Sequence, residues 1–289
     1  MMVVQMSQTV RWSRVARFVG RVIIFALLLA GAALALFPLV WMLSTSLKPD
    51  SEVFKLPPSW IPAHPRWENY REAVTLIPYW RYTLNTIIIT ALVVSGTVIT
   101  STMVAYSFAR LRAPGLSALF ALALSTIMLP TSVTLIPTFL IYRQLHWIGT
   151  YLPLVVPSWL GGGAFNIFLL RQFFLALPRE PEEAARVDGA GYLTILWRIV
   201  VPQSIPALTA VAIFNFVASW NDFLDPLIYL DKPEQFTLSL GINSFKDIYF
   251  SHWNYLMAAA LVAALPCVLV VFFANRLFIR GVVISGHGQ

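Results

Sequence analysis

Long uncharged, mostly apolar runs alternate with short charged segments along this chain. A helix that crosses a bilayer needs about 20 consecutive apolar residues, and six runs reach that length. They cover Val22–Leu47, Tyr82–Ala109, Ala113–Tyr142, Gln144–Leu170, Ile199–Asn221 and Ile248–Asn275. The pattern therefore predicts an all-α membrane protein with six transmembrane helices.

The segments between the runs predict how the chain is organised. Residues 1–21 form a short basic arm, and residues 22–289 form a single transmembrane domain. Within that domain we expect an outer loop at residues 48–81, a charged block at residues 171–202 and a second outer loop at residues 231–252. Arg143–Thr150 predicts a short outer turn. The glycine cluster at Leu160–Phe165 indicates close helix packing, because small residues let backbones approach.

The distribution of charge predicts the orientation of the chain. Its residues are 58% hydrophobic and 11% charged, whereas soluble domains are about 25% charged. Cytoplasmic loops of membrane proteins carry an excess of Lys and Arg. With both termini in the cytoplasm, the inner segments hold 12 basic and 4 acidic residues, and the outer segments hold 8 basic and 9 acidic. The formal net charge of +7 thus indicates topology and contact with the lipid bilayer, not nucleic-acid binding.

The sequence offers no pattern that is typical of catalysis. The single Cys267 lies within the sixth run and the four histidines are scattered, so we expect neither a disulfide framework nor a metal site. A phosphate-binding loop needs GxxxxGK[ST], and the four lysines all fall in outer segments (Lys48, Lys55, Lys232 and Lys246). We expect no enzyme activity and no cofactor in this chain.

The charged block has the pattern of a helix, a turn and a second helix. Three glutamates fall in the first helical turn, where negative charge suits the helix dipole: Glu180, Glu182 and Glu183. Asp188-Gly189-Ala190-Gly191 then predicts the helix end, because glycine tolerates the left-handed conformation found there. A second piece, Tyr192–Val201, places one apolar stripe on a single face: Leu193, Leu196, Trp197 and Val200. We expect this helix–turn–helix on the cytoplasmic side, between transmembrane helices 4 and 5.

Two interpretations of the first helix remain open. Ala184 and Ala185 give it a small, flat surface beside a carboxylate, which suits docking into a groove of another protein. The alternative is an interfacial helix that rests on lipid. A lipid-facing helix would carry large apolar and basic residues, whereas this one is acidic and small, so docking is favoured.

The block and later segments resemble a known family. Glu183-Ala184-Ala185 with Asp188-Gly189-Ala190, followed by Pro202 and Pro206, is similar to the EAA motif of permease subunits of ATP-binding-cassette (ABC) importers. Trp220-Asn221-Asp222-Phe223-Leu224-Asp225-Pro226-Leu227 resembles a signature of maltose-type carbohydrate importers. Further matches run to the C-terminal end: Phe236–Gly241, Trp253, Met257–Ala259 and Arg280-Gly281. The resemblance covers nearly the whole chain from Leu47-Lys48-Pro49 onwards.

The resemblance implies a multi-pass subunit of a bacterial or archaeal plasma membrane that forms half of a pore. Its partners would be a second permease, two ATPase subunits that bind ATP and Mg, and an extracytoplasmic sugar-binding protein. The ATPase-coupling residues would be Glu182, Glu183, Ala184, Ala185, Asp188, Gly189 and Ala190. Glu183 would meet the ATPase groove, and Gly189 would permit the turn. Leu196 stands where many relatives have Phe, which predicts altered packing of the second helix on its partner.

Residues of the fifth run and its outer end are candidates for the substrate pathway. They are Phe214, Phe216, Trp220, Asn221, Asp222 and Tyr229, because aromatic rings cover the C–H faces of sugars and amides bond to hydroxyls. The alternative is an interfacial aromatic belt or ordinary core. Asp222 and Asp225 are also expected to hold a helix end or an outer gate.

Other transport functions also fit parts of the sequence. The same architecture could import glycerol phosphate or another non-sugar solute, although the runs contain no Lys or Arg to pair with a phosphate. A secondary transporter is less favoured, because such proteins use intramembrane carboxylates or histidines for ion coupling. A membrane enzyme is the least favoured reading.

Overall fold

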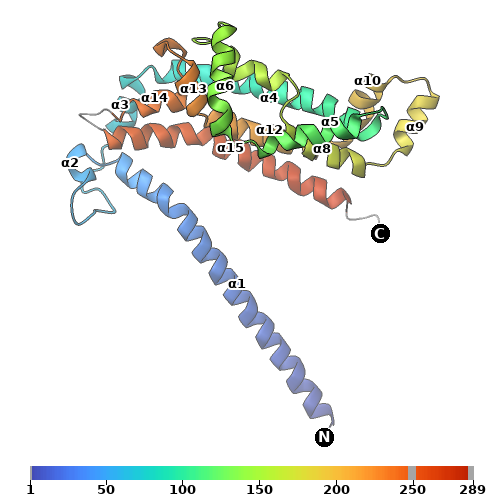
Figure 1. Ribbon diagram of the computed structural model, residues 1–289. Helices are drawn as coiled ribbons and strands as arrows, with labels where there is room; N and C mark the ends of the chain where they lie inside the picture. The colour runs from blue at the N-terminus through green and yellow to red at the C-terminus, as the bar shows by residue number, and fades with distance from the viewer. Residues whose placement is uncertain (1, 247–251, 286–289) are drawn as a thin grey trace. The chain divides into compact units, whose positions relative to one another are not determined.

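The computed structural model describes the backbone of residues 2–246 and 252–285 and the side chains of residues 18–246 and 252–274. Every regular element in these ranges is a helix (Figure 1). The prediction of an all-α protein is therefore confirmed. The side chains of the basic arm up to residue 17 lie outside the described part.

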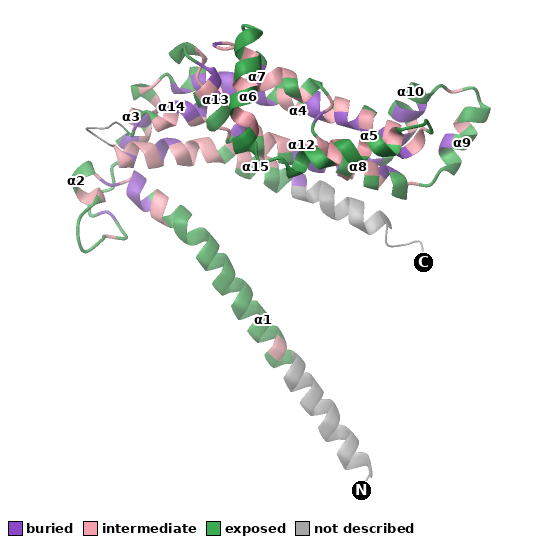
Figure 2. Cartoon of the chain, in the orientation of Figure 1, coloured by how far each residue is buried: buried purple, intermediate pink, exposed green. Residues whose placement is uncertain are grey.

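Four stretches are long and apolar enough to cross a membrane: Phe18–Ser46, Tyr79–Arg110, Leu152–Ala176 and Trp253–Ala274. The first belongs to α1 (Met2–Ser46), the second is α4 (Tyr79–Arg110) and the last begins α15 (Trp253–Ser285). Between Phe18 and Leu43 most large apolar residues of α1 are exposed, and Figure 2 colours most of this stretch green. This is the surface that a bilayer would cover. Two further helix pairs, each sharply bent, bring the number of candidate spans to six.

The third predicted span is not one helix but a bent pair. α5 (Leu116–Ser125) continues as a 3-10 turn, Thr126–Met128, and then turns by 104° into α6 (Thr131–Gln144). Pro130 causes the break, since it lacks an N–H and forces the preceding Leu129 into an extended conformation (φ −78°, ψ 118°).

The fifth predicted span is also broken. α10 (Tyr192–Ile195), a π-helix (Leu196–Val200) and α11 (Val201–Gln203) precede a bend of 83° into α12 (Ile205–Trp220). Pro202 and Pro206 flank the bend at Ser204, and neither supplies the backbone N–H that a continuous helix needs.

The fourth predicted span begins later than Gln144. Residues 145–151 form the turn predicted between the third and fourth runs, with His146 (φ 56°) and Gly149 (φ 76°) in the left-handed region. α7 (Leu152–Val155), a 3-10 turn (Val156–Trp159) and α8 (Ala164–Ala176) follow. The close packing predicted for the glycine cluster is confirmed at Gly162, where a Cβ would lie 2.6 Å from the carbonyl oxygen of Thr97.

The chain divides into two compact units. Unit 1 comprises residues 1–73 and 245–261, and it contains α2 (Asp50–Val53) and the start of α3 (Glu68–Leu76). Asn69 organises the polar loop there, because its amide donates to the carbonyl oxygens of Ser46 (2.8 Å) and Lys48 (2.9 Å). The end of α1 is thereby tied to the outer loop without a long helix, as its prolines predict.

Unit 2 comprises residues 74–244 and 262–289, and α4 is its central helix. α4 packs along both α8 and α12. A buried core joins these helices to the π-helix and includes Tyr106, Leu170, Phe174, Leu196 and Val211. α9 (Glu180–Val187) and α10 lie at one end of this unit, and α13 (Leu224–Tyr229) and α14 (Leu238–Asn243) lie at the other (Figure 1).

Candidate functional site

The charged block begins with α9, which has the start and the end that its sequence predicts. Glu180, Glu182 and Glu183 occupy the first turn, with Pro181 beside them. Gly189 ends the helix in the left-handed region (φ 84°). The N–H of Gly189 donates to Arg186 O (3.1 Å), and the N–H of Ala190 donates to Ala185 O (2.9 Å). This pair of bonds is a Schellman motif, which fixes the direction of the chain after the helix.

The second half of the block packs differently from the predicted stripe. Ile195, Leu196 and Val200 are buried, whereas Leu193 and Trp197 are exposed. The π-helix at Leu196–Val200 explains the difference, because its wider turn rotates side chains away from the α-helical pattern. Leu196 enters the core of this chain, and the predicted effect of this residue on packing against a partner stays a prediction.

Two adjacent glutamates of α9 lie in opposite environments. Glu182 is buried, and its Oε1 accepts from Arg110 Nε at 2.7 Å; only 3% of the Arg110 side chain and 4% of the Glu182 side chain are exposed. Glu183 is exposed. Glu183 is therefore free to meet a partner, as predicted for it, whereas Glu182 is paired with Arg110 within this chain.

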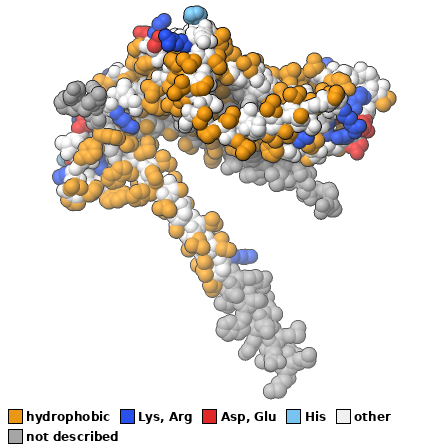
Figure 3. All heavy atoms as spheres, in the orientation of Figure 1, with side chains coloured by type: hydrophobic (Ala, Val, Ile, Leu, Met, Phe, Trp, Pro, Cys, Tyr) orange, Lys and Arg blue, Asp and Glu red, His pale blue; other side chains and the backbone are white. Residues whose placement is uncertain are grey.

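The remaining coupling candidates divide in the same way. Ala184, Asp188 and Gly189 are exposed, while Ala185 and Ala190 are half-buried against the core. Figure 3 shows basic and acidic side chains together over α9, beside a surface that is otherwise largely apolar. The exposed face of the block thus combines a small side chain, a carboxylate and a turn with a fixed direction.

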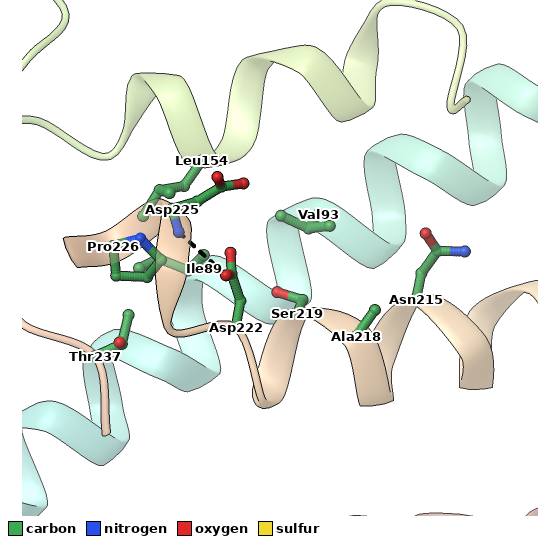
Figure 4. Close-up of a pocket in the computed structure, with 10 residues that line it drawn as sticks. All are labelled: Ile89, Val93, Leu154, Asn215, Ala218, Ser219, Asp222, Asp225, Pro226 and Thr237. Atoms are coloured by element: carbon green, nitrogen blue, oxygen red, sulfur yellow. Dashed lines mark hydrogen bonds between the residues drawn. The ribbon is translucent and has the colours of Figure 1, made fainter. Parts of the chain in front are cut away.

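A polar cavity of about 270 Å³ lies toward the other end of unit 2 (Figure 4). Asn215, Ser219 and Asp222 line it from α12 and the residues that follow, and Asp225 lines it from α13. Ile89 and Val93 of α4, Leu154, Ala218, Pro226 and Thr237 complete the wall. In Figure 4 the Asp222 carboxylate points toward the backbone N–H of Asp225, which donates to it at 3.3 Å. The prediction that Asp222 holds a helix end agrees with this bond, since α13 begins there.

The environment of the cavity shifts the titration of its carboxyl groups. Burial, together with the negative charge of Asp225, raises the pKa of Asp222 to about 6, although two backbone hydrogen bonds act in the opposite direction. Desolvation by the surrounding helices also raises the pKa of Asp225. The cavity therefore changes charge within the range of physiological pH.

A second cavity of about 220 Å³ shares Leu154 and Asp225 with the first. Tyr229 lines it together with Tyr142, and their rings meet edge to face with centroids 5.3 Å apart. Threonines supply most of its remaining polar groups: Thr131, Thr134 and Thr138. Asp225 thus lines both cavities. Asp222 lines the first cavity and Tyr229 lines the second.

The other four predicted pathway residues do not line these two cavities. Phe214 and Asn221 are exposed. Phe216 and Trp220 stack with centroids 5.5 Å apart and line a separate, apolar cavity of about 270 Å³. Trp220 is buried, and its Nε1 donates to Ala263 O of α15 at 2.9 Å. For Trp220 this geometry favours the core interpretation.

Sequence reasoning missed several polar residues of the cavity. Asn215 and Ser219 are four positions apart and lie on one face of α12, and Asp222 follows three positions later, just after the helix ends. That spacing was available in the sequence as a polar stripe on an otherwise apolar run. Asn215 also pairs with Asn166 of α8, to whose Oδ1 it donates at 3.1 Å. Arg110 had no comparable signal, because its partner lies 72 positions away. In the ranges with described side chains, no group of three His, Cys, Asp or Glu residues is placed to hold a metal ion.

A helical bundle with several apolar spans, an open polar cavity and a charged helix–turn–helix at one end of unit 2 is typical of a membrane transport subunit. Residues 101–284 match the family model described as "Binding-protein-dependent transport system inner membrane component". The chain belongs to this family and is the permease subunit of an ABC importer.

Relatives from two bacteria match most of the chain. It is 33% identical over 267 residues to the sn-glycerol-3-phosphate transport system permease protein UgpE of Yersinia pestis bv. Antiqua (strain Antiqua), covering 90% of this chain and 94% of that protein. It is 30% identical over 274 residues to the probable ABC transporter permease protein YurM of Bacillus subtilis (strain 168), covering 92% and 88%.

Solved structures share the fold. A bacterial ABC transporter involved in the import of the acidic polysaccharide alginate matches with a TM-score of 0.79 and 24% identity, over 89% of this chain and 95% of that chain. The MetNI methionine ABC transporter in an inward-facing conformation matches with a TM-score of 0.53 and 15% identity, over 70% and 95%. At these identities the likeness concerns the fold alone.

Proposed function

We propose that this permease forms half of the pore of an ATP-driven importer of a neutral, polyhydroxylated solute such as a sugar. A second permease subunit completes the pore, two ATPase subunits bind on the cytoplasmic side, and an extracytoplasmic binding protein delivers the solute. ATP and Mg are held by the ATPase subunits. The resemblance to maltose-type importers and the family membership support this assembly.

The exposed face of α9 is the observation that carries the proposal. Glu183 and Ala184 lie on that face, and the Schellman motif at Gly189 fixes its position above the buried core. A small residue beside a carboxylate fits a groove with basic or polar walls. Closure of the ATPase pair then moves the block and biases the permease between two states.

The polar cavity supports a neutral solute. The residues that line the two joined cavities include Asp222 and Asp225 and no Lys or Arg. Carboxylates accept hydrogen bonds from sugar hydroxyls, whereas they repel phosphate at short distance. Asn215, Ser219 and Thr237 add further hydrogen-bonding groups.

Glycerol 3-phosphate is the second candidate, because several relatives are named for its transport. The charge of the cavity argues against it unless the second permease supplies basic residues. Uptake by cells that express the complete transporter separates the two. We expect accumulation of a radiolabelled neutral oligosaccharide and none of radiolabelled glycerol 3-phosphate. Accumulation of glycerol 3-phosphate alone would contradict the assignment of a neutral solute.

The role of α9 is tested in the same cells with Glu183→Lys. We expect normal insertion into the membrane and at least a tenfold loss of uptake, since reversed charge opposes docking to a basic groove. Glu234→Lys is the matched control, because Glu234 lies in the second outer loop, and it should retain uptake. Normal uptake by the Glu183→Lys transporter would contradict the proposed docking role of α9.

A further inference from the structure

The contact between Arg110 and Glu182 joins the charged block to the last residue of α4. Arg110 Nε donates to Glu182 Oε1 at 2.7 Å, and its Nη2 donates to Leu177 O at 3.1 Å. One guanidinium thus holds both the first turn of α9 and the backbone that leads into it. A planar guanidinium with several fixed donors sets direction as well as distance.

Burial makes this contact specific. Both side chains are almost fully buried, in contrast to the surface pair Arg66–Glu72, whose side chains are 45% and 40% exposed. A buried charge must stay paired, because an unpaired charge in a low-dielectric interior is costly. When α9 moves, the partner of Glu182 must therefore move with it.

α4 connects this contact to the polar cavity. Arg110 is its last residue, and Ile89 and Val93 of the same helix line the cavity. A continuous α-helix rises about 1.5 Å per residue. The part of α4 between Val93 and Arg110 therefore connects the cavity to the ion pair as one rigid element. Between Ile89 and Val93, Thr90 Oγ1 lies 3.2 Å from Ser219 Oγ, so α4 also contacts α12 at the cavity.

Other contacts between the block and α4 include a hydrogen bond from Arg171 Nε to Phe108 O at 3.2 Å and a shared apolar core. Ala105, Tyr106 and Ala109 share a core with Ile195, Leu196 and Val200. Apolar packing resists separation, but it fixes no hydrogen-bond direction. The Arg110–Glu182 ion pair joins α4 to α9 through two oppositely charged, buried side chains.

We propose that Arg110 is a positioning residue that transmits movement of α9 to α4 and thereby to the cavity, through its buried ion pair with Glu182. The proposal rests on the proposed docking of ATPase subunits on α9. It adds a route inside the permease, from the docking helix to the cavity wall, that consists of one ion pair and one continuous helix.

The test measures the cavity directly and needs no identified solute. Cys267 is the one cysteine of the chain, so Cys267→Ala gives a background in which Ser219→Cys reports from the cavity wall. The complete transporter is labelled with a hydrophilic maleimide, with and without ATP plus vanadate. In the parent we expect nucleotide to change the labelling rate of this cysteine at least fivefold.

Glu182→Gln keeps the shape of the side chain and removes its charge. We expect the change in labelling rate to fall below twofold, while the ATPase subunits still co-purify in unchanged amount. Glu180→Gln, an exposed residue of the same helix, should keep the fivefold change. A fivefold change in Glu182→Gln would overturn the proposal and leave the pair with a structural role only.

A double-mutant cycle tests whether Arg110 acts through Glu182. Arg110→Gln combined with Glu182→Gln should lose no more of the labelling change than either single variant, since both remove one link. Separate, additive losses would contradict this route. Docking is measured separately from transmission by co-purification of the ATPase subunits. We expect the Glu183→Lys transporter to lose these subunits and the Glu182→Gln transporter to keep them.

Discussion

Gly189 is the residue on which the geometry of the charged block depends most directly. Its φ of 84° lies in the left-handed region, and a Cβ there would meet no atom within 4 Å. Backbone strain is therefore the only cost of a larger residue. For an L-residue other than Gly, Asn or Asp that cost is about 1–2 kcal/mol.

Gly189→Ala should weaken binding of purified ATPase subunits to the permease by roughly five- to thirtyfold, which corresponds to that strain. Gly189→Asn should lose less, because Asn tolerates the left-handed conformation. The dissociation constants are measured on permease in nanodiscs. Equal affinities for the parent and both variants would mean that the turn does not matter for docking.

Asp222 makes a prediction about pH. Its folded-state pKa, about 6, is higher than its ordinary value of 3.8, so the folded protein binds the proton more tightly than the unfolded chain. Ionisation at neutral pH thus opposes folding, and stability rises as pH falls through 6 toward the unfolded value.

Asp222→Asn should raise the melting temperature of the permease at pH 8 and leave it nearly unchanged at a pH well below 3.8, where the wild-type carboxyl is protonated in both states. Asn retains an oxygen that accepts from Asp225 N, so the start of α13 is kept. Thermal unfolding at both pH values measures the difference. A gain of the same size at both would contradict the pKa shift as its cause.

At the residue scale, the sequence predicts the turn but not which glutamate is buried. Gly189 and the first-turn glutamates follow local rules of helix ends. Glu182 and Glu183 are identical neighbours, and only the packing of α9 on Arg110 decides which of them faces the interior. That partner is distant in sequence, so no local pattern indicates it.

At the scale of elements, the contact between α8 and α4 depends on two neighbouring glycines in different ways. Gly161 (φ 109°) has open space around it, whereas a Cβ on Gly162 (φ 70°) would lie 2.6 Å from Thr97 O and 2.8 Å from Ser101 Cβ. Both positions are strained by a substitution, but only Gly162 is also in a close helix contact.

Gly162→Ala should therefore destabilise the permease by about 1–3 kcal/mol more than Gly161→Ala, which is the usual cost of overpacking. Denaturant unfolding of the two variants in detergent gives this difference. Gly161→Ala is the control, because it introduces backbone strain without a close contact. Its loss of stability is subtracted from that of Gly162→Ala. Equal stabilities would show that α4 and α8 separate without cost at this point.

The helices themselves were predictable as apolar runs, but their continuity was not. Runs of uncharged residues located α1, α4 and α15 well. Pro130 and the pair Pro202 and Pro206 convert two other runs into sharply bent pairs. Prolines occur in straight membrane helices as well, as Pro38 in α1 and Pro266 in α15 illustrate. Neighbouring helices decide which prolines bend a span, and the sequence does not display those neighbours.

At the scale of the molecule, unit 2 holds two candidate functional regions toward opposite ends of α4. One end carries the exposed face of α9, and the other carries the polar cavity with Asp222 and Asp225. The family and its fold followed from motifs, topology and composition. The cavity required the structure, because Ile89, Leu154 and Thr237 come from elements far apart in sequence.

The central claim is that α9 docks on an ATPase subunit rather than on lipid, and crosslinking at Ala184 tests it most directly. Ala184 is exposed, and Ala184→Cys in the Cys267→Ala background accepts a short photoreactive probe. Arg112→Cys, exposed in the turn after α4, is the control. We predict that light joins the probe at residue 184 to the ATP-binding subunit in the membrane-embedded transporter, and that the probe at residue 112 gives much less of this product. Crosslinks from residue 184 to lipid alone would contradict the account.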